Sequence, residues 1–317
     1  MSHYTHLTTE EREKTIAFLA LGLSFRAIAR KLKRNPSTIS REIARNSKKN
    51  GEYSSSFAEK KYKARRKLCC RRCLLLNDEL YDYVIERMFL NWTPEQIAGR
   101  AKLEKYHISF SYSTIYRAIN TTLLPIWLRK KMRFRAKYKH KKPYAKRDKI
   151  PDTVNISKRP KSIERRKCFG HWESDTILGM RKTGAFATHV ERKSGYLIAL
   201  KLENIRDNIF NKATIQAFID VPKHIKKTFT VDNGSEFFSH KQLAKETGMK
   251  VYFCDPYSPW QRGTNENTNG LLRQFFPKKT SFASVTQALL DHVVYLINHR
   301  PRKRLGWKSP AEVLHLK

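Results

Sequence analysis

The chain has 317 residues, and 65 lysines and arginines against 28 aspartates and glutamates give it a formal net charge of +37. Such an excess of positive charge favours a polyanionic partner, either nucleic acid or an anionic membrane surface. No apolar run reaches the roughly 18 residues of a membrane-spanning helix, and the N-terminus lacks an apolar signal-peptide core. Nucleic acid is therefore the expected partner, with no membrane. The five cysteines, an odd number, indicate a reducing, intracellular setting.

Residues 1–50 predict three short helices. Thr8 and Glu11 have the spacing of a capping box at the start of the first helix. The third helix begins at Asn35 and Pro36, with asparagine as the N-cap and proline at the first helical position. Two short helices joined by a tight turn are typical of a helix-turn-helix unit.

The third helix has an apolar side and a polar side. Ile39 and Ile43, four residues apart, are expected to face inward. Ser37, Thr38 and Arg41 then face outward and are our candidates for DNA contact. The alternative is a small helical bundle whose polar face only meets solvent, but the net charge favours DNA binding.

The same pattern recurs in residues 77–125. Thr93 and Gln96 form a second capping-box pair. The seven residues from 113 share a serine, a threonine, an arginine and two isoleucines with residues 37–43, at the same spacing. The repeat predicts a second helix-turn-helix domain. Its DNA-binding candidates are Ser113, Thr114 and Arg117.

Two basic segments separate these parts. Residues 51–76 are expected to be a connector, and they contain the cluster Cys69, Cys70 and Cys73. A zinc site would need a fourth ligand, and no second cysteine pair lies nearby, so ordinary thiols are favoured and the role of the cluster stays open. Residues 126–165 are expected to be a linker. Within it, residues 129–149 hold 12 lysines and arginines, which predicts contact with phosphates, although a solvated charge run is the alternative.

The pattern changes in residues 166–317, the expected catalytic domain with its C-terminal helix. Three strands are predicted first, then helices alternating with strands, at 170–178, 185–191, 195–202, 204–220, 228–232, 240–247, 250–253, 264–276 and 284–299. Three antiparallel strands followed by alternating helices and strands predict a mixed sheet of the ribonuclease-H-like α/β class. The fold class is therefore this catalytic core preceded by all-α helix-turn-helix units.

Three carboxylates are the candidate catalytic and metal-binding residues. Asp175 lies in the first strand, Asp232 ends a later strand, and Glu266 opens a helix. In this architecture the two strands are neighbours, so the three side chains should meet. Two divalent cations held by carboxylates would suit cleavage of phosphodiester bonds. Glu173 is a rival ligand on the same strand face. Weaker rivals are Asp255 and Glu236.

Two residues border this expected site in the sequence. Arg262 is a candidate for holding a DNA phosphate. Trp260 is expected to pack in the core, with stacking on a base as the less favoured alternative.

Several motifs resemble the bacterial DDE transposases of the insertion sequence thirty family. They comprise residues 170–175 (GHWESD), 190–194 (VERKS), 232–237 (DNGSEF), 254–267 (CDPYSPWQRGTNEN) and 300–312 (RPRKRLGWKSPAE). The resemblance is strong over the catalytic half. Over the N-terminal region it extends only to the type of domain, a helix-turn-helix. The run from Cys254 to Asn267 is the most specific of these motifs.

The resemblance implies that Asp175, Asp232 and Glu266 are the acidic triad of a polynucleotidyl transferase. It implies two Mg²⁺ ions, replaceable by Mn²⁺, that support nicking at element ends and then transfer of the freed 3′-hydroxyl to target DNA. The expected partners are double-stranded DNA, both terminal inverted repeats and target, and further copies of the chain in a synaptic complex. The expected location is the bacterial cytoplasm, at the nucleoid. The alternatives are a DNA-binding regulator with a relic catalytic domain and a related integrase or nuclease.

Overall fold

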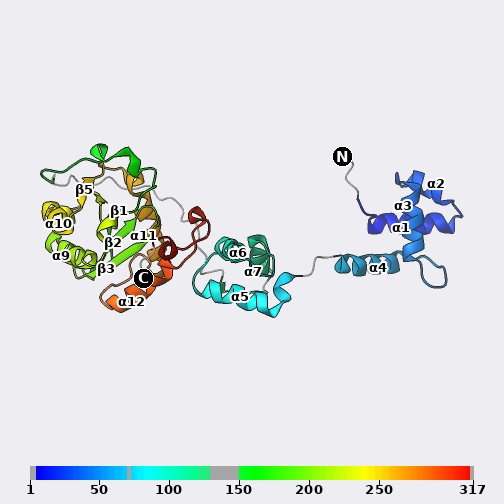
Figure 1. The fold of residues 1–317 in the computed structure, drawn as a ribbon. Coiled ribbons are helices and arrows are strands. Elements are labelled where there is room, and N and C mark those ends of the chain that lie inside the picture. Colours follow the sequence, from blue (N-terminus) through cyan, green and yellow to red (C-terminus); the bar gives the residue numbers. More distant parts are fainter. Residues whose placement is uncertain (1–4, 70–72, 122, 126, 129–149, 315–317) are drawn as a thin grey trace. The chain divides into compact units, whose positions relative to one another are not determined.

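The structure is a computed structural model that describes residues 5–69, 73–121, 123–125, 127–128 and 150–314. The chain divides into two compact units, Met1–Cys73 and Leu74–Lys317 (Figure 1). None of the helices in these described ranges is long and apolar enough to cross a membrane. Cys70 and the basic run 129–149 lie outside the described residues.

Four helices make up the described part of the first unit: α1 (Thr9–Ala20), α2 (Phe25–Lys31), α3 (Pro36–Asn46) and α4 (Ser55–Leu68). Both predicted caps are confirmed, because Thr8 and Glu11 form a capping box and Asn35 caps α3 with Pro36 in its first turn. Ile39 is fully buried against α2, which leaves the polar side of α3 outward.

The helix α4 lies where we expected only a connector. Ser55–Leu68 packs against α1 and α3. Arg12, 1% exposed, forms ion pairs with Glu59 of α4 and with Glu42 of α3. An arginine buried in this way needs carboxylate partners, so α4 belongs to the first unit. The sequence hid this helix because only Ala58 of α4 is buried, which leaves almost no apolar stripe to detect.

The second unit begins with a helical part made of η1 (Leu74–Leu76), α5 (Asp78–Phe89), α6 (Pro94–Leu103) and α7 (Tyr112–Asn120). Thr93 and Gln96 form the predicted capping box of α6. Ile97 of α6 and Ile115 of α7 are fully buried, and α6 packs on α7. The two predicted helix-turn-helix patterns thus occur as similar helix pairs, α2 with α3 and α6 with α7.

A mixed sheet of five strands forms the centre of the second unit, in the order β3-β2-β1-β4-β5. The strands are β1 (His171–Leu178), β2 (Ala185–Glu191), β3 (Leu197–Leu202), β4 (Thr228–Val231) and β5 (Lys250–Phe253). The first three pair antiparallel, whereas β4 runs parallel to both β1 and β5. All residues of β2 are buried, as expected for a strand covered on both faces.

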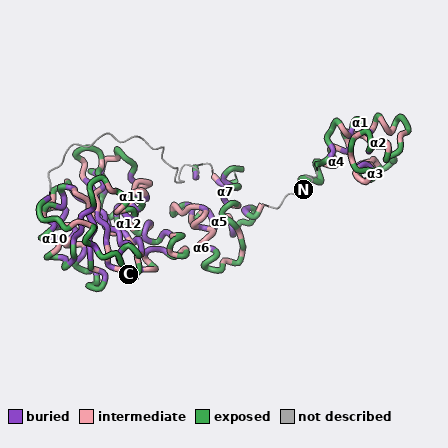
Figure 2. The backbone as a smooth tube through the Cα atoms, turned by 90° about the horizontal axis from the view of Figure 1, so that it is seen from above, coloured by how far each residue is buried: buried purple, intermediate pink, exposed green. Residues whose placement is uncertain are grey.

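Helices cover the two faces of this sheet (Figure 1), and buried residues gather among these helices (Figure 2). On one face, α9 (Asp207–Phe218) and α10 (His240–Thr247) enclose a core in which Trp172 packs edge-on against Phe218, with ring centroids 5.0 Å apart. On the other face, α11 (Gly263–Phe275) and α12 (Gln287–Asn298) cover Ile177 and Phe186. Alternate residues of β1 therefore enter different cores.

Residues 150–163, which we expected to be part of a linker, pack against the sheet. They include η2 (Ile156–Lys158) and η3 (Lys161–Ile163). The Phe253 amide donates to the carbonyl of Val154 at 2.8 Å, and Arg159 donates to the buried hydroxyl of Thr230 at 2.9 Å. This part of the expected linker is thus a component of the catalytic domain. The remaining short helices are η4 (Lys223–Ile225), η5 (Ser235–Phe237), η6 (Pro259–Arg262), η7 (Lys303–Leu305) and α13 (Pro310–Leu314).

Candidate active site

Asp175 and Asp232 lie at the same edge of the sheet. Asp175 is in β1, and Asp232 follows Val231, the last residue of β4. The two strands are parallel neighbours, with Glu173 opposite Thr230 in the register. Since adjacent parallel strands end at the same edge, residues at their carboxyl ends lie close together. The predicted adjacency of these two strands is confirmed.

Arg262 lies between the two aspartates. Its Nη1 is 3.0 Å from Oδ1 of Asp175, and its Nη2 is 2.9 Å from Oδ2 of Asp232. Nη1 also donates to the backbone carbonyl of Ser174 at 3.0 Å. The side chains are 13%, 26% and 34% exposed for the arginine, Asp175 and Asp232. A planar guanidinium thus holds two largely shielded carboxylates with opposite ends of its fork.

The local electrostatics follow from this arrangement. Burial by itself would lower the pKa of Arg262, but the charges of Asp175 and Asp232 outweigh it and raise that pKa above its ordinary value. Burial raises the pKa of Asp175, and the charge of Asp232 adds to this, while Arg262 opposes both. Arg262 therefore counters the burial and the like charge that disfavour the ionised form of Asp175.

The turn after β4 is built to keep Asp232 in place. The Gly234 amide donates to Oδ1 of Asp232 at 3.1 Å, and the Asn233 side chain donates to the carbonyl of Cys254 at 2.9 Å. A Cβ on Gly234 would lie 2.3 Å from Oε2 of Glu236 and 3.0 Å from Oδ1 of Asp232. A side chain at this position would therefore displace the carboxylate of Glu236, because two carboxylates approach the backbone from the same side.

Glu236, which the sequence indicated only as a weak rival, lies near the two aspartates. It is 7% exposed, and its Oε1 accepts a hydrogen bond of 2.7 Å from the hydroxyl of Thr176. Burial raises its pKa, and the negative charges of Asp232 and Asp175 raise it further. The signal in the sequence was its position four residues after Asp232, in the turn that brings it back toward the strand edge.

Glu266 lies in the first turn of α11, and its side chain is exposed. Within the described ranges there is no group of three His, Cys, Asp or Glu side chains close enough to hold a metal ion. The structure therefore brings Asp175 and Asp232 together but does not bring Glu266 into the same cluster. The contact from α11 to the aspartates is made instead by Asn269, whose Nδ2 donates to Oδ2 of Asp175 at 3.0 Å.

The other rival carboxylates have partners of their own. Glu173 is fully buried, forms an ion pair of 2.9 Å with Arg192, and accepts from the backbone amide of Asn265 at 2.9 Å. It therefore anchors the start of α11. Asp255 accepts from Gln261 and from Asn155, both at 2.8 Å, which lowers its pKa. The structure gives both residues a role in holding the loops and helix around the site.

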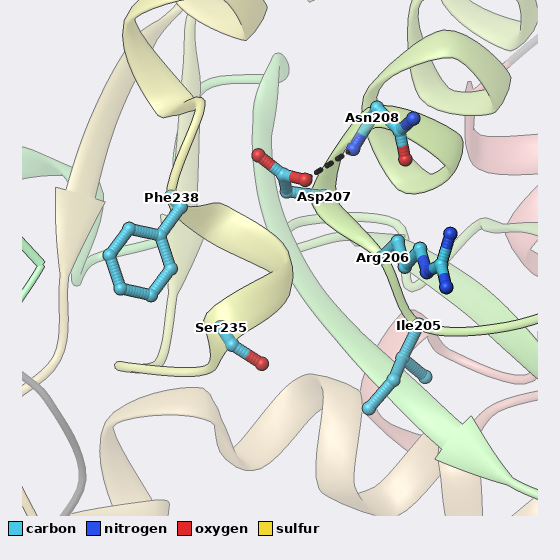
Figure 3. A pocket seen from close by; sticks show the side chains of 6 residues that line it. All are labelled: Ile205, Arg206, Asp207, Asn208, Ser235 and Phe238. Carbon is cyan, nitrogen blue, oxygen red and sulfur yellow. Dashed lines mark hydrogen bonds between the residues drawn. The ribbon is translucent and has the colours of Figure 1, made fainter.

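A shallow hollow of about 600 Å³ lies beside the η5 turn (Figure 3). It is lined by the start of α9 and by η5, through Ile205, Arg206, Asp207, Asn208, Ser235 and Phe238. Asp207 accepts from the amide of Asn208 at 2.8 Å, as drawn in Figure 3, and its other oxygen accepts from the hydroxyl of Ser239. Neither aspartate of the site lines this hollow.

The expected core position of Trp260 is wrong. Trp260 is 72% exposed, and Tyr257 in the same loop is 75% exposed. Both precede Arg262 and α11. The sequence could not distinguish an aromatic residue of the core from one at a surface, because η6 is too short to show an apolar period.

The DNA-contact candidates occupy matching places on α3 and α7. Arg41 and Arg117 are both exposed, as is Ser113, while Ser37 and the two threonines, Thr38 and Thr114, are partly buried. The Arg41 guanidinium donates to the hydroxyl of Ser37 at 2.9 Å. Each arginine thus lies on the outer side of a helix whose isoleucines face inward. Cys69 and Cys73 are free thiols, so no disulfide ties the described part of the cysteine cluster.

Comparison with known proteins identifies the family of this chain. Residues 3–46 match the model of a helix-turn-helix domain, and residues 165–259 match that of an integrase core domain. The chain is 39% identical to the transposase InsI for insertion sequence element IS30C of Escherichia coli K12, over 98% of this chain and 83% of the relative. It belongs to the IS30 family of transposases.

Other members are similarly close to this IS30-family chain. It is 37% identical to the transposase for IS4351 of Bacteroides fragilis, with 97% of this chain and 94% of the relative covered. It is 36% identical to the transposase for IS1086 of Cupriavidus metallidurans, over 98% and 94%. Asp175 and Asp232 both fall inside the range of the integrase core, and the sheet of this IS30-family transposase has the mixed ribonuclease-H-like form.

Proposed function

We propose that this IS30-family transposase is a DDE-type enzyme that binds the terminal inverted repeats of an insertion sequence. It nicks DNA at those ends and joins the freed 3′-hydroxyl to target DNA, with two divalent cations, Mg²⁺ or in its place Mn²⁺. The observation that carries this proposal is the pair Asp175 and Asp232, which share one cationic group at the carboxyl edge of two parallel strands.

The donors around this pair suit hard divalent cations. They are carboxylate oxygens of Asp175 and Asp232, with Glu236 nearby. Oδ1 of Asn269 is buried and accepts no hydrogen bond within the described residues, while Nδ2 of the same side chain touches Asp175. Oxygen donors of this kind are what Mg²⁺ and Mn²⁺ take in proteins. The guanidinium of Arg262 shows that positive charge is stable between the two aspartates.

We assign the third position of the triad to Glu266. It lies three residues before Asn269 on α11, and residues at this spacing are neighbours on one side of a helix. A rotation of the exposed Glu266 side chain toward Asn269 would bring its carboxylate to the Asp175 edge. When bound, the two cations supply activation of the attacking oxygen and neutralisation of the leaving oxygen. Asp175, Asp232 and Glu266 would hold them in place.

Arg262 then has a second task in this proposal. With divalent cations held by Asp175 and Asp232, the guanidinium of Arg262 would no longer have those carboxylates as its best partners. The planar fork of arginine matches two oxygens of a phosphate, so Arg262 would turn to the DNA backbone beside the bond to be cut. The exposed Trp260 nearby can stack on a base at the same place.

DNA recognition would fall to residues 1–50 and 77–125, and chemistry to residues 166–317. We propose that Ser37, Thr38 and Arg41 of α3 and Ser113, Thr114 and Arg117 of α7 contact the element ends. The charge of +37 supplies affinity that does not depend on sequence. Transposition pairs two ends, so we further propose that the protein works as a homo-oligomer on DNA, in the cytoplasm at the nucleoid.

The substitution Asp232→Asn tests this function, with Asp220→Asn as the matched control. Asp232→Asn keeps the size of the side chain and removes the ligand charge, so end binding should persist while nicking and strand transfer collapse. Asp220 is an exposed carboxylate that follows α9 and lies outside the candidate site, so its variant should nick like the wild type. Footprinting measures binding, and labelled duplex with Mg²⁺ or with excess chelator measures nicking. Nicking that persists in chelator would overturn the metal mechanism.

The second candidate function is a DNA-binding regulator whose catalytic half only serves assembly. The exposed position of Glu266, outside the carboxylate cluster, is the observation in its favour. The same assay separates the two, because a regulator binds the ends and nicks neither with Mg²⁺ nor with Mn²⁺.

A further inference from the structure

One side of α6 is held by the C-terminal segment of residues 300–312, which we name the C-terminal clamp. Gln96, Gly99 and Arg100 make the contacts. Gly99 and Arg100 follow Gln96 by three and four residues, so the three residues share one side of the helix. Ile97 and Ala101 are buried on the side that faces the helical part itself. The helix α6 therefore packs on two partners at once.

Arg100 forms the polar contact of the clamp. Its Nη1 and Nη2 each lie 2.7 Å from a different oxygen of Glu312, and Nη1 also donates to the carbonyl of Trp307 at 3.3 Å. Glu312 in turn accepts from the backbone amide of Ser309 at 2.6 Å, so the same carboxylate caps the start of α13. A two-point contact of this kind fixes orientation as well as distance.

Gly99 forms the steric contact. A Cβ on Gly99 would lie 2.2 Å from two ring carbons of Trp307 and 2.7 Å from a third. The indole thus lies directly on the α6 backbone, where only glycine leaves room. Trp307 itself has a φ of 69°, in the left-handed region that a tryptophan rarely adopts. Such a conformation persists where the packing of the side chain holds it.

Arg300 links α6 to the catalytic helix. It is 3% exposed, and its Nε donates to Oε1 of Gln96 at 2.8 Å while its Nη1 donates to Gln274 of α11 at 2.9 Å. The Gln96 side chain also donates to the carbonyl of Pro301 at 2.8 Å. One buried side chain therefore connects the helical part to the helix that carries Glu266.

The clamp leaves the outer side of α7 free for DNA. Its contacts to the helical part are made by α6, and Ser113 and Arg117 of α7 remain exposed. Glu95 of α6 accepts from the hydroxyl of Tyr116 at 2.8 Å, so α7 follows the position of α6. The clamp thus sets the position of α7 and does not cover the outer side of this helix.

We propose that the C-terminal clamp fixes the spacing between the DNA held by α7 and the aspartate pair, and so determines which phosphodiester is cut. This inference rests on the proposed function, because it concerns the place of the cut and not the ability to cut. The partner is double-stranded DNA that lies across α7 and the carboxylate edge together.

The substitution Gly99→Ala tests the clamp, because alanine favours a helix but its methyl group meets the Trp307 ring. Trp307→Ala removes the ring and so its contact with α6. The double variant Gly99→Ala/Trp307→Ala also lacks this contact, but it has no clash between the alanine methyl group and the ring. Arg100→Ala breaks the two-point contact, and Lys102→Ala is its control, since Lys102 is an exposed cation on the same helix. Amide exchange in α6 and α13 reports docking, and mapping of nicks at nucleotide resolution on an element end reports the place of the cut.

The wild type and Lys102→Ala should give one dominant nick and protected amides. Gly99→Ala and Arg100→Ala should keep the footprint over the α7 part of the end, expose α13 to exchange and spread the nicks over neighbouring bonds. Equal exchange and an unchanged nick position in both clamp variants would overturn the inference. If the wild type does not nick with Mg²⁺ or Mn²⁺, the proposed function fails instead. Faster exchange without spreading of nicks would show that the clamp is structural and does not choose the bond.

Discussion

Nη2 of Arg262 lies 2.9 Å from Oδ2 of Asp232, so the residue before α11 is bound to the residue after β4. The same guanidinium reaches Asp175 at 3.0 Å. Without a cation between them, two carboxylates this close to each other would repel. Arg262 thus offsets this repulsion and keeps the pair assembled.

Removal of this guanidinium should make the protein depend on metal for part of its stability. Arg262→Ala in chelator should lower the free energy of unfolding by about 1 kcal/mol, allowing for the partial exposure of both aspartates. Mg²⁺ should then raise the melting temperature of the variant more than that of the wild type, because the cation no longer competes with the guanidinium. Arg273→Ala is the control, since Arg273 lies on α11 but donates to backbone carbonyls. An equal Mg²⁺ shift in all three proteins would contradict this role.

The third carboxylate can be identified by comparing Glu266 with Glu236. We expect Glu266→Gln to lose nicking by about a thousandfold, roughly 4 kcal/mol in the barrier. Glu236→Gln should retain measurable nicking, because a glutamine oxygen can still accept from Thr176. Single-turnover nicking rates with Mn²⁺, at saturating protein, compare the two variants without a contribution from binding. The reverse ranking would move the third position to Glu236.

The acid stability of the clamp follows from Glu312. The contact with Arg100 lowers the pKa of Glu312 from 4.5 to about 2. A carboxylate with a lowered pKa stabilises the folded state above its unfolded pKa, and this contribution disappears as the pH falls from 4.5 toward 2. Glu312→Gln should therefore be less stable than the wild type at pH 7, by about 0.5–1 kcal/mol because the pair is partly exposed. The melting temperatures of the two proteins should converge only as the pH falls to about 2. A difference that stays constant with pH would contradict the prediction.

Arg41 and Arg117 should act on single base pairs of the element end. If each reads a guanine edge, alanine at either position should cost about 1–3 kcal/mol at one base pair and leave other positions unchanged. Binding to a set of end duplexes, each with one base pair replaced, measures this effect. A uniform loss over all duplexes, with a smaller salt dependence, would instead show that the arginine contacts phosphate.

The sequence by itself determined the elements that depend on near neighbours. The capping boxes at Thr8 and Thr93 and the inward isoleucines of α3 and α7 occur as predicted. These features involve residues three or four positions apart, whose geometry is set by the helix itself. The approach of Asp175 to Asp232 was also predictable, because neighbouring parallel strands place their carboxyl ends at the same edge of the sheet.

Only the tertiary structure decided the contacts between residues that are distant in the chain. It placed Arg262 between the aspartates, buried Glu236 beside them and left Glu266 and Trp260 exposed. It also made a helix of Ser55–Leu68 and joined Arg100 to Glu312 across 212 residues. An arginine or glutamate carries no local signal of its partner, because the partner is chosen by how helices and sheet pack and by which charges that packing shields from water.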